Sequence, residues 1–259
     1  ALAATTTPTA SLPALRDLTP DELDAGWKQV CYGVKYVVKL LKENAGIHTS
    51  TLIPSINALV PLVVLLGAQE DKFDQADALI YWLLGAFISG RYSAAADTKI
   101  AQDSLAARSP DPVRAIYKSA GLLGASMQVA PQQLIGKGAG SPFFLLSYLA
   151  ARSRQAEDWW YGVKIHEGIG DGAFAIEYHH VHPRTTLAGT YTKAEINDLS
   201  NLAFISGRAN RKIGGRSPQV YFPELQANGK DQLSPHLVPV EPTFRTADRY
   251  LDFLSARRA

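Results

Sequence analysis

The segment EYHHVHP, from Glu177 to Pro183, contains the residues whose types and spacing best suit a chemical reaction. Two adjacent imidazoles, His179 and His180, end a strand-like apolar run. Asn201 opens a second apolar run, and Asn210 follows nine positions later in a polar, basic stretch. Histidine accepts a proton near neutral pH because its ordinary pKa is about 6.5. These residues predict metal-assisted hydrolysis of a phosphodiester, in which a base deprotonates water and a hard cation stabilises charge on the phosphate.

The same residues resemble the HNH, or His-Me finger, nuclease domain at the C-terminal end of GmrSD-type modification-dependent restriction proteins. This family includes the SspE-like phosphorothioation-sensing nicking enzymes. The matching stretches are IEYHHVHPRTTL, INDLSNLAFISGRANRKIGGRSP and YFPEL, and a weaker likeness covers the helical run at residues 74–103. The resemblance implies that His180 is the general base and His179 the first metal ligand. It also implies that Asn210 is the second ligand and that Asn201 holds the loop and orients the base.

The activity implied by this resemblance is that of a metal-dependent DNA endonuclease or nickase in bacterial defence, using one Mg²⁺ or Mn²⁺ ion. Between His179 and Arg216, six basic residues accompany two acidic ones, a local net charge of +4. Such a surface suits phosphate binding. The candidates for binding the phosphates of the DNA backbone are Arg184, Arg208, Arg211, Lys212 and Arg216. Two other classes stay open: a catalytically silent DNA-binding or interaction module, and a nuclease that acts on RNA.

The resemblance also implies a further partner. Full-length members have an N-terminal nucleotide-binding domain with an Asp-Gly-Gln-Gln-Arg type motif, and this sequence contains no such motif. We therefore expect a C-terminal fragment, or one subunit of a split system whose partner supplies that domain. The single cysteine, Cys31, excludes a disulfide within the chain and a four-Cys zinc ribbon. The most apolar stretch, residues 59–68, is too short to span a bilayer, so we expect a cytoplasmic protein without membrane contact.

The overall pattern predicts a mainly α fold with a helical domain at 1–155 and an HNH nuclease domain at 156–259. The second domain is expected to be a small α+β unit of the ββα-metal type with a C-terminal helix. Residues 1–13, rich in Thr, Ala and Pro, are expected to be disordered or loosely attached. The sequence Thr19-Pro20-Asp21-Glu22 has the cap, the proline and the acids of a helix start.

The remaining elements follow from periodicity and turn signals. Further helices are expected near 52–68, 72–91, 93–107, 111–120, 131–136 and 142–155, then near 207–213 and within 246–259, with strands near 173–179 and 202–206. Trp159, Trp160 and Tyr161 are expected in the core, with stacking on bases as the alternative. Glu177 is expected to be a solvated strand carboxylate, with a partner of the site residues or a substrate-side acid as the alternatives. The roles of His166 and His182 stay open.

Overall fold

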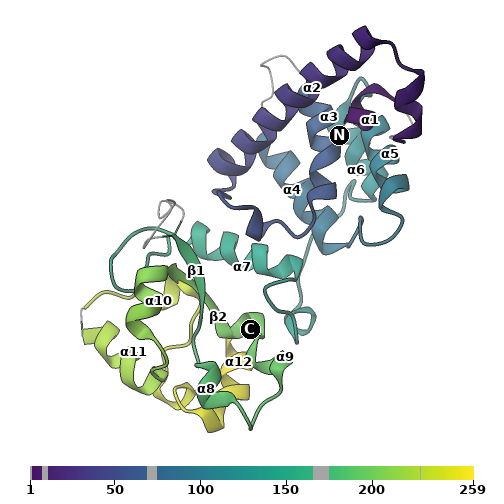
Figure 1. Cartoon of the computed structure of the whole chain (residues 1–259). Helices are drawn as coiled ribbons and strands as arrows, with labels where there is room; N and C mark the ends of the chain where they lie inside the picture. The colour runs from purple at the N-terminus through teal and green to yellow at the C-terminus, as the bar shows by residue number, and fades with distance from the viewer. Residues whose placement is uncertain (1, 8–10, 69–74, 166–174, 228) are drawn as a thin grey trace. The chain divides into compact units, whose positions relative to one another are not determined.

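The chain folds into two compact units, which are described separately. The computed structural model describes residues 2–7, 11–68, 75–165, 175–227 and 229–259 (Figure 1). The units are Ala1–Gln128 and Val129–Ala259. Within the described ranges the chain is mainly helical with one two-stranded sheet, which confirms the predicted mainly α class. None of the helices in these ranges is long and apolar enough to cross a membrane.

The first unit is built from helices whose starts follow local sequence signals. Its helices are α1 (Leu2–Thr6), α2 (Pro20–Lys39), α3 (Leu59–Gly67), α4 (Ala76–Ile88), α5 (Ala96–Ala106) and α6 (Pro112–Ala120). At the start of α2 the Thr19 hydroxyl accepts a hydrogen bond from the Glu22 N–H, and the Glu22 carboxylate accepts one from the Thr19 N–H. Gly33 lets α2 approach α3, because a Cβ there would lie 2.1 Å from the carbonyl oxygen of Val63.

Two expectations for the first unit are wrong. Residues 2–6 form α1 instead of a disordered N-terminus, since Ala3 and Ala4 are buried and Gly26 of α2 leaves room for Thr6. The helix expected over 52–68 is broken into two short 3-10 turns, Ser50–Leu52 and Ile56–Ala58, followed by α3. The break falls where Ile53, which precedes Pro54, is extended, because proline disfavours helical conformation in the residue before it.

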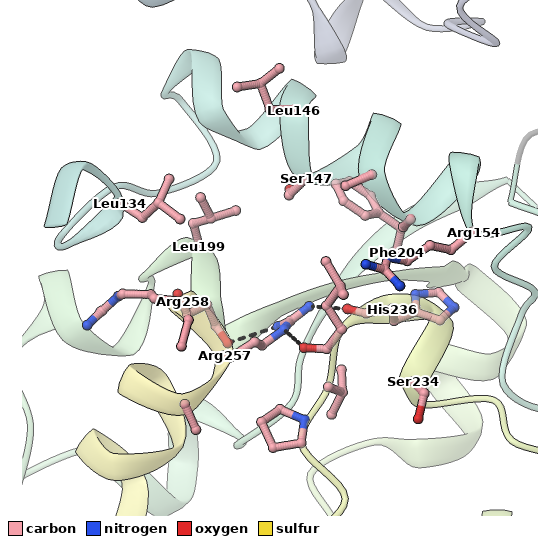
Figure 2. A pocket seen from close by; sticks show the side chains of 18 of the residues that line it. Leu134, Leu146, Ser147, Arg154, Leu199, Phe204, Ser234, His236, Arg257 and Arg258 are labelled. Carbon is pink, nitrogen blue, oxygen red and sulfur yellow. Dashed lines mark hydrogen bonds between the residues drawn. The ribbon is translucent and has the colours of Figure 1, made fainter. Parts of the chain in front are cut away.

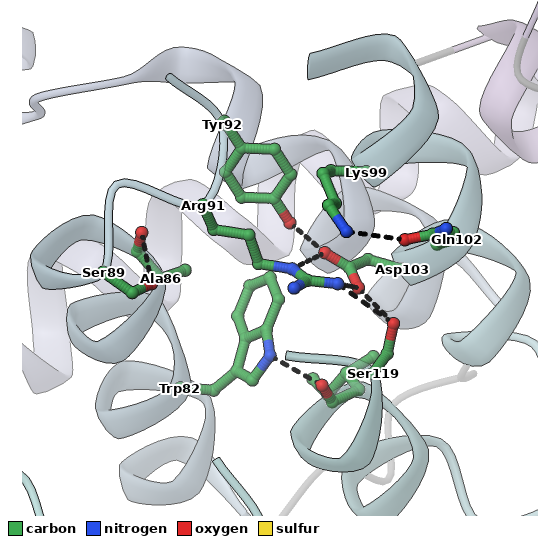
Figure 3. A network of polar contacts seen from close by, with 10 residues as sticks. Trp82, Ala86, Ser89, Arg91, Tyr92, Lys99, Gln102, Asp103 and Ser119 are labelled. Carbon is green, nitrogen blue, oxygen red and sulfur yellow. Dashed lines mark hydrogen bonds and ion pairs between the residues drawn. The ribbon is translucent and has the colours of Figure 1, made fainter. Parts of the chain in front are cut away.

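A buried polar network lies among the helices of the first unit (Figure 3). The Asp103 carboxylate on α5 accepts hydrogen bonds from Arg91 Nε at 2.6 Å, from Ser119 Oγ at 2.6 Å and from the Tyr92 hydroxyl at 2.5 Å. Asp103 is fully buried, and a buried carboxylate is tolerated only when it is paired and hydrogen-bonded. The network therefore has a structural explanation without reference to a ligand.

The second unit surrounds a two-stranded antiparallel sheet. Its elements are α7 (Pro142–Ser153), β1 (Ile176–His180), α8 (Arg184–Leu187), α9 (Lys193–Ile196), β2 (Leu202–Ser206), α10 (Gly207–Ile213), α11 (Pro218–Ala227) and α12 (Tyr250–Arg258). The unit begins at Val129, so it includes α7, which the predicted boundary at 155 assigned to the helical domain. The turn near 131–136 is a short 3-10 helix, Pro131–Leu134.

Strands β1 and β2 lie side by side in the second unit, with α7 and α10 nearby (Figure 1). The strand register runs from Ile176 opposite Ser206 to His180 opposite Leu202. Tyr178 and Phe204 contact Phe144 of α7, with ring centres 5.5 and 4.8 Å away. Because side chains alternate along a strand, Glu177 and His179 lie on the other face, which α10 covers. Residues 173–174 of the expected first strand lie outside the described residues.

Candidate active site

The end of β1 and the middle of α10 bring together the two residues expected to hold a metal ion. Atom Nδ1 of His179 lies 2.9 Å from Oδ1 of Asn210. His179 is buried and its ring is nearly perpendicular to the rings of Trp159 and Tyr221. Its Nε2 has no hydrogen-bond partner among the described residues. The ring is thus fixed with Nδ1 facing the Asn210 amide. Trp159 lies in the core, as predicted.

Glu177 is partly exposed, as expected of a solvated carboxylate, and it also orients the Asn210 side chain, which was the alternative expectation. Its Oε2 accepts a hydrogen bond from Asn210 Nδ2 at 2.8 Å. Because the amide nitrogen is held there, the amide oxygen faces His179. Gly207, the first residue of α10, leaves the space that this contact needs, since a Cβ there would lie 2.5 Å from Oε1 of Glu177.

His180, the expected base, contacts two side chains through Nε2. Oδ1 of Asn197 lies 3.0 Å from this nitrogen, and Nε of Arg184 donates a hydrogen bond to it at 3.1 Å. The two contacts favour different tautomers, since Asn197 Oδ1 requires a proton on Nε2 and Arg184 requires a lone pair. The sequence did not indicate Asn197 as a site residue, because only the fold of the loop after β1 brings its side chain to His180.

Asn201 holds the backbone of the loop that follows β1. It is fully buried; its Oδ1 accepts from the His182 N–H at 2.8 Å, and its Nδ2 donates to the carbonyls of His182 and Ile196, both at 3.0 Å. These bonds fit the expected loop-holding role. The direct side-chain contacts to the His180 imidazole are made by Asn197 and Arg184, whereas the Asn201 amide bonds backbone groups.

The three histidines of the segment are all neutral at pH 7 for the same reason. Burial lowers the pKa of His179 and of His182 to about 4, and it also lowers the pKa of His180. His182 is a core residue: its Nε2 lies 2.9 Å from the Phe244 carbonyl oxygen and its ring centre 4.7 Å from that of Phe253. The neutral His180 imidazole is the form that accepts a proton. His166 lies outside the described residues.

The basic residues of α10 are placed beside two aromatic rings. The guanidinium carbon of Arg208 lies 4.5 Å from the Tyr161 ring centre, and Nζ of Lys212 lies 4.8 Å from the Trp160 ring centre. These are cation–π distances, at which the cation retains its charge. Arg208 and Lys212 therefore lie on α10, the helix that also contains Asn210.

Two other basic residues expected to contact DNA have acidic neighbours. Arg216 forms a bidentate pair with Glu224, with both oxygens 2.8 Å from Nη1. Arg211 lies 3.8 Å from Glu177. The charge of Arg216 is therefore largely offset by Glu224.

The pair formed by His179 and Asn210 suits a hard divalent ion. The 2.9 Å contact is a hydrogen bond that Nδ1–H donates to Oδ1, so Nδ1 must release this proton before the two atoms can share a metal ion. Across the described parts of the chain, no three His, Cys, Asp or Glu side chains gather in a group that could hold a metal. Two protein ligands would leave the other positions to phosphate and water. An imidazole nitrogen and an amide oxygen are the only protein ligands that this pair would offer to the expected ion.

A cavity of about 670 Å³ in the second unit is separate from this pair (Figure 2). It is lined by Leu146 of α7, by Phe204 of β2 and by Arg257 of α12. Phe204 points to the face of the sheet opposite His179. The Arg257 guanidinium donates to the carbonyls of Ser200, His236 and Leu237, so it is already fully engaged. The cavity is not part of the candidate active site.

Comparison of the chain with protein-family models, with curated proteins and with solved structures finds no match. The assignment of an activity consequently depends on the residues of the site and on the resemblance of its motif.

Proposed function

We propose that this chain is a metal-dependent endonuclease or nickase that hydrolyses DNA phosphodiester bonds with one Mg²⁺ or Mn²⁺ ion. The observation that carries the proposal is the 2.9 Å approach of His179 Nδ1 to Asn210 Oδ1. His180 follows His179 in the chain, with its side chain on the other face of β1 at the strand's end. When bound, the ion would stabilise charge on the scissile phosphate and the leaving oxygen. The HNH-like motif supports the same chemistry, and with it a role in bacterial defence against foreign DNA.

In this proposal His180 Nδ1 accepts the proton of the attacking water. The tautomer with a proton on Nε2 donates to Asn197 Oδ1 and leaves the lone pair on Nδ1. The exposed Arg184 opposes this tautomer, because its Nε donates to the same Nε2. When a DNA phosphate draws Arg184 away, Nε2 becomes available to Asn197. Arg184 thus couples DNA binding to activation of the base.

Cleavage of supercoiled plasmid with Mg²⁺, Mn²⁺ or EDTA tests the proposal, with an RNA substrate of equal length in parallel. We expect metal-dependent nicking of DNA and a loss of about 10²–10⁴ in rate for His180→Ala. His48→Ala, which removes a histidine of the other unit, is the matched control and should leave the rate unchanged. DNA binding without cleavage would favour the silent binding module, and preferred cleavage of RNA would favour the RNA nuclease. Equal rates for His180→Ala and the wild type would contradict the assignment of the base.

A further inference from the structure

Helix α2 has a second apolar face that the described residues leave exposed. Trp27 is 56% exposed, Val34 44% and Val38 42%, and Cys31 is exposed between them. The positions 27, 31, 34 and 38 follow the 4–3–4 spacing with which helices pair in coiled coils. The core-facing side of the same helix carries Val30, Gly33 and Val37, which are buried. The exposed residues are therefore additional to those that hold α2 in its unit.

The charges beside this row are divided between its two ends. Asp21, Glu22 and Asp24 are exposed in the N-terminal half of α2, and Lys28 there pairs with Asp24 at 2.6 Å. The C-terminal half and the turn that follows carry Lys35, Lys39 and Lys42, which are also exposed, and Glu43, which lies 4.0 Å from Lys39. Each end therefore contains one opposite charge, and the net charges are −2 and +2. Two such helices side by side in opposite directions set acids against lysines at both ends. In the same direction they would set like charges together, which is unfavourable.

We infer that this face, Trp27, Cys31, Val34 and Val38, is the interface of a homodimer in which two α2 helices pair antiparallel. The middle of the row falls between Cys31 and Val34, so a two-fold axis there lets each row cover the other. Four side chains on each copy make a surface below the roughly 800 Å² per partner of a stable interface. The dimer is therefore weak, with a Kd of about 1–100 μM.

Sedimentation velocity of the full chain from about 1 to 200 μM tests this pairing, since the range spans the expected Kd. The wild type should shift from monomer to dimer, and Trp27→Glu should raise the Kd at least about tenfold. Leu105→Glu on α5 is the matched control, because Leu105 is 57% exposed outside the row, and it should dimerise like the wild type. A wild type that stays monomeric throughout, or a Trp27→Glu variant that dimerises normally, would overturn the inference.

Charge reversal tests the direction of pairing and leaves the apolar face of α2 intact. Asp21→Lys with Asp24→Lys, and separately Lys35→Glu with Lys39→Glu, should each dimerise more weakly than the wild type. An equimolar mixture of the two variants should recover dimer, because each acidic end then meets a basic end again. If either variant alone dimerises as well as the wild type, the antiparallel arrangement is wrong.

Cys31 gives an independent readout because it is the only cysteine of the chain. The antiparallel pairing brings the two copies of Cys31 close to the axis, so a short bis-maleimide should join wild-type chains into covalent dimers. The Trp27→Glu variant, which keeps Cys31, should give few. Equal yields from the two proteins would show that the cross-links come from random collisions and would contradict the interface.

Discussion

Replacing Asn201 by alanine tests how the loop after β1 is held. The Asn201 side chain bonds three buried backbone groups: the N–H and the carbonyl of His182 and the carbonyl of Ile196. His182 is 1% exposed and Ile196 8%, so solvent outside the fold cannot replace these bonds without opening the loop. Asn201→Ala leaves the three groups unpaired at the point where the chain leaves the candidate active site.

The magnitude follows from the count of unpaired groups. Each buried polar group left without a partner costs roughly 1–3 kcal/mol. A water molecule entering the space of the lost amide would recover part of that cost. We therefore expect the free energy of unfolding of the second unit to fall by about 3–4 kcal/mol. A loss of that size is a large share of the ~5–15 kcal/mol that a typical domain has.

Hydrogen exchange at the His182 amide, measured with denaturant unfolding, gives the assay. Asn201→Ala should expose this amide to exchange, and its cleavage should not recover with excess Mn²⁺, because the defect is in the loop. Asn197→Ala is the control: its side chain contacts His180 and the Lys193 carbonyl near the surface, so stability should change by less than about 1 kcal/mol. An Asn201→Ala protein as stable as the wild type, with a protected His182 amide, would refute this account of the loop.

Three further predictions concern metal, DNA and pH. Glu177→Ala frees the Asn210 amide, so the Kd for Mn²⁺ measured by calorimetry should rise. Glu177→Gln retains an acceptor oxygen and should bind Mn²⁺ nearly as the wild type does. Identical affinities for all three proteins would exclude the orienting role of Glu177. Arg208→Ala with Lys212→Ala should lower the slope of log K against log salt for duplex DNA by about 1.8 in magnitude, at about 0.9 per phosphate contact, and an unchanged slope would place the DNA elsewhere. Burial lowers the pKa of His236 to about 4. Between about pH 6.5 and 4, His236 is therefore protonated in the unfolded chain and neutral in the folded chain. His236 alone should lower stability by up to about 3 kcal/mol between pH 6.5 and 4, in addition to the contributions of His179 and His182. His236→Gln, whose amide can still donate to Glu157, should reduce the pH dependence by that amount; parallel pH curves for the two proteins would contradict it.

The local elements around the site were predictable because each has a short-range cause. A short continuous apolar run at residues 202–205 indicates β2. The Ser206 side chain caps α10 by accepting from the Ala209 N–H at 3.1 Å. The positions predicted for β2 and α10 are confirmed. His179 is on β1 and Asn210 is on α10, which directly follows β2. The resemblance of the motif predicts that these two residues approach each other.

The contacts that orient these residues were not predictable, because they depend on tertiary packing. The bond of Glu177 to Asn210 requires the register of β1 on β2 and the absence of a side chain at Gly207. The place of α7 in the second unit depends on aromatic contacts with Phe204 across the sheet. Helix α11 was not among the expected helices; it contains Pro223, a residue that disfavours a helix interior.

The contacts of α12 have a consequence for the synthesis of the protein. Arg257 donates to the Ser200 carbonyl and the Tyr250 hydroxyl to the Glu195 carbonyl, so the last helix holds both ends of the segment containing Asn197. That segment cannot reach its final arrangement until α12 has left the ribosome. A chain stalled before α12 would therefore carry His180 without an ordered Asn197 beside it, and pulse proteolysis of such chains should show residues 195–200 cleaved until α12 is made.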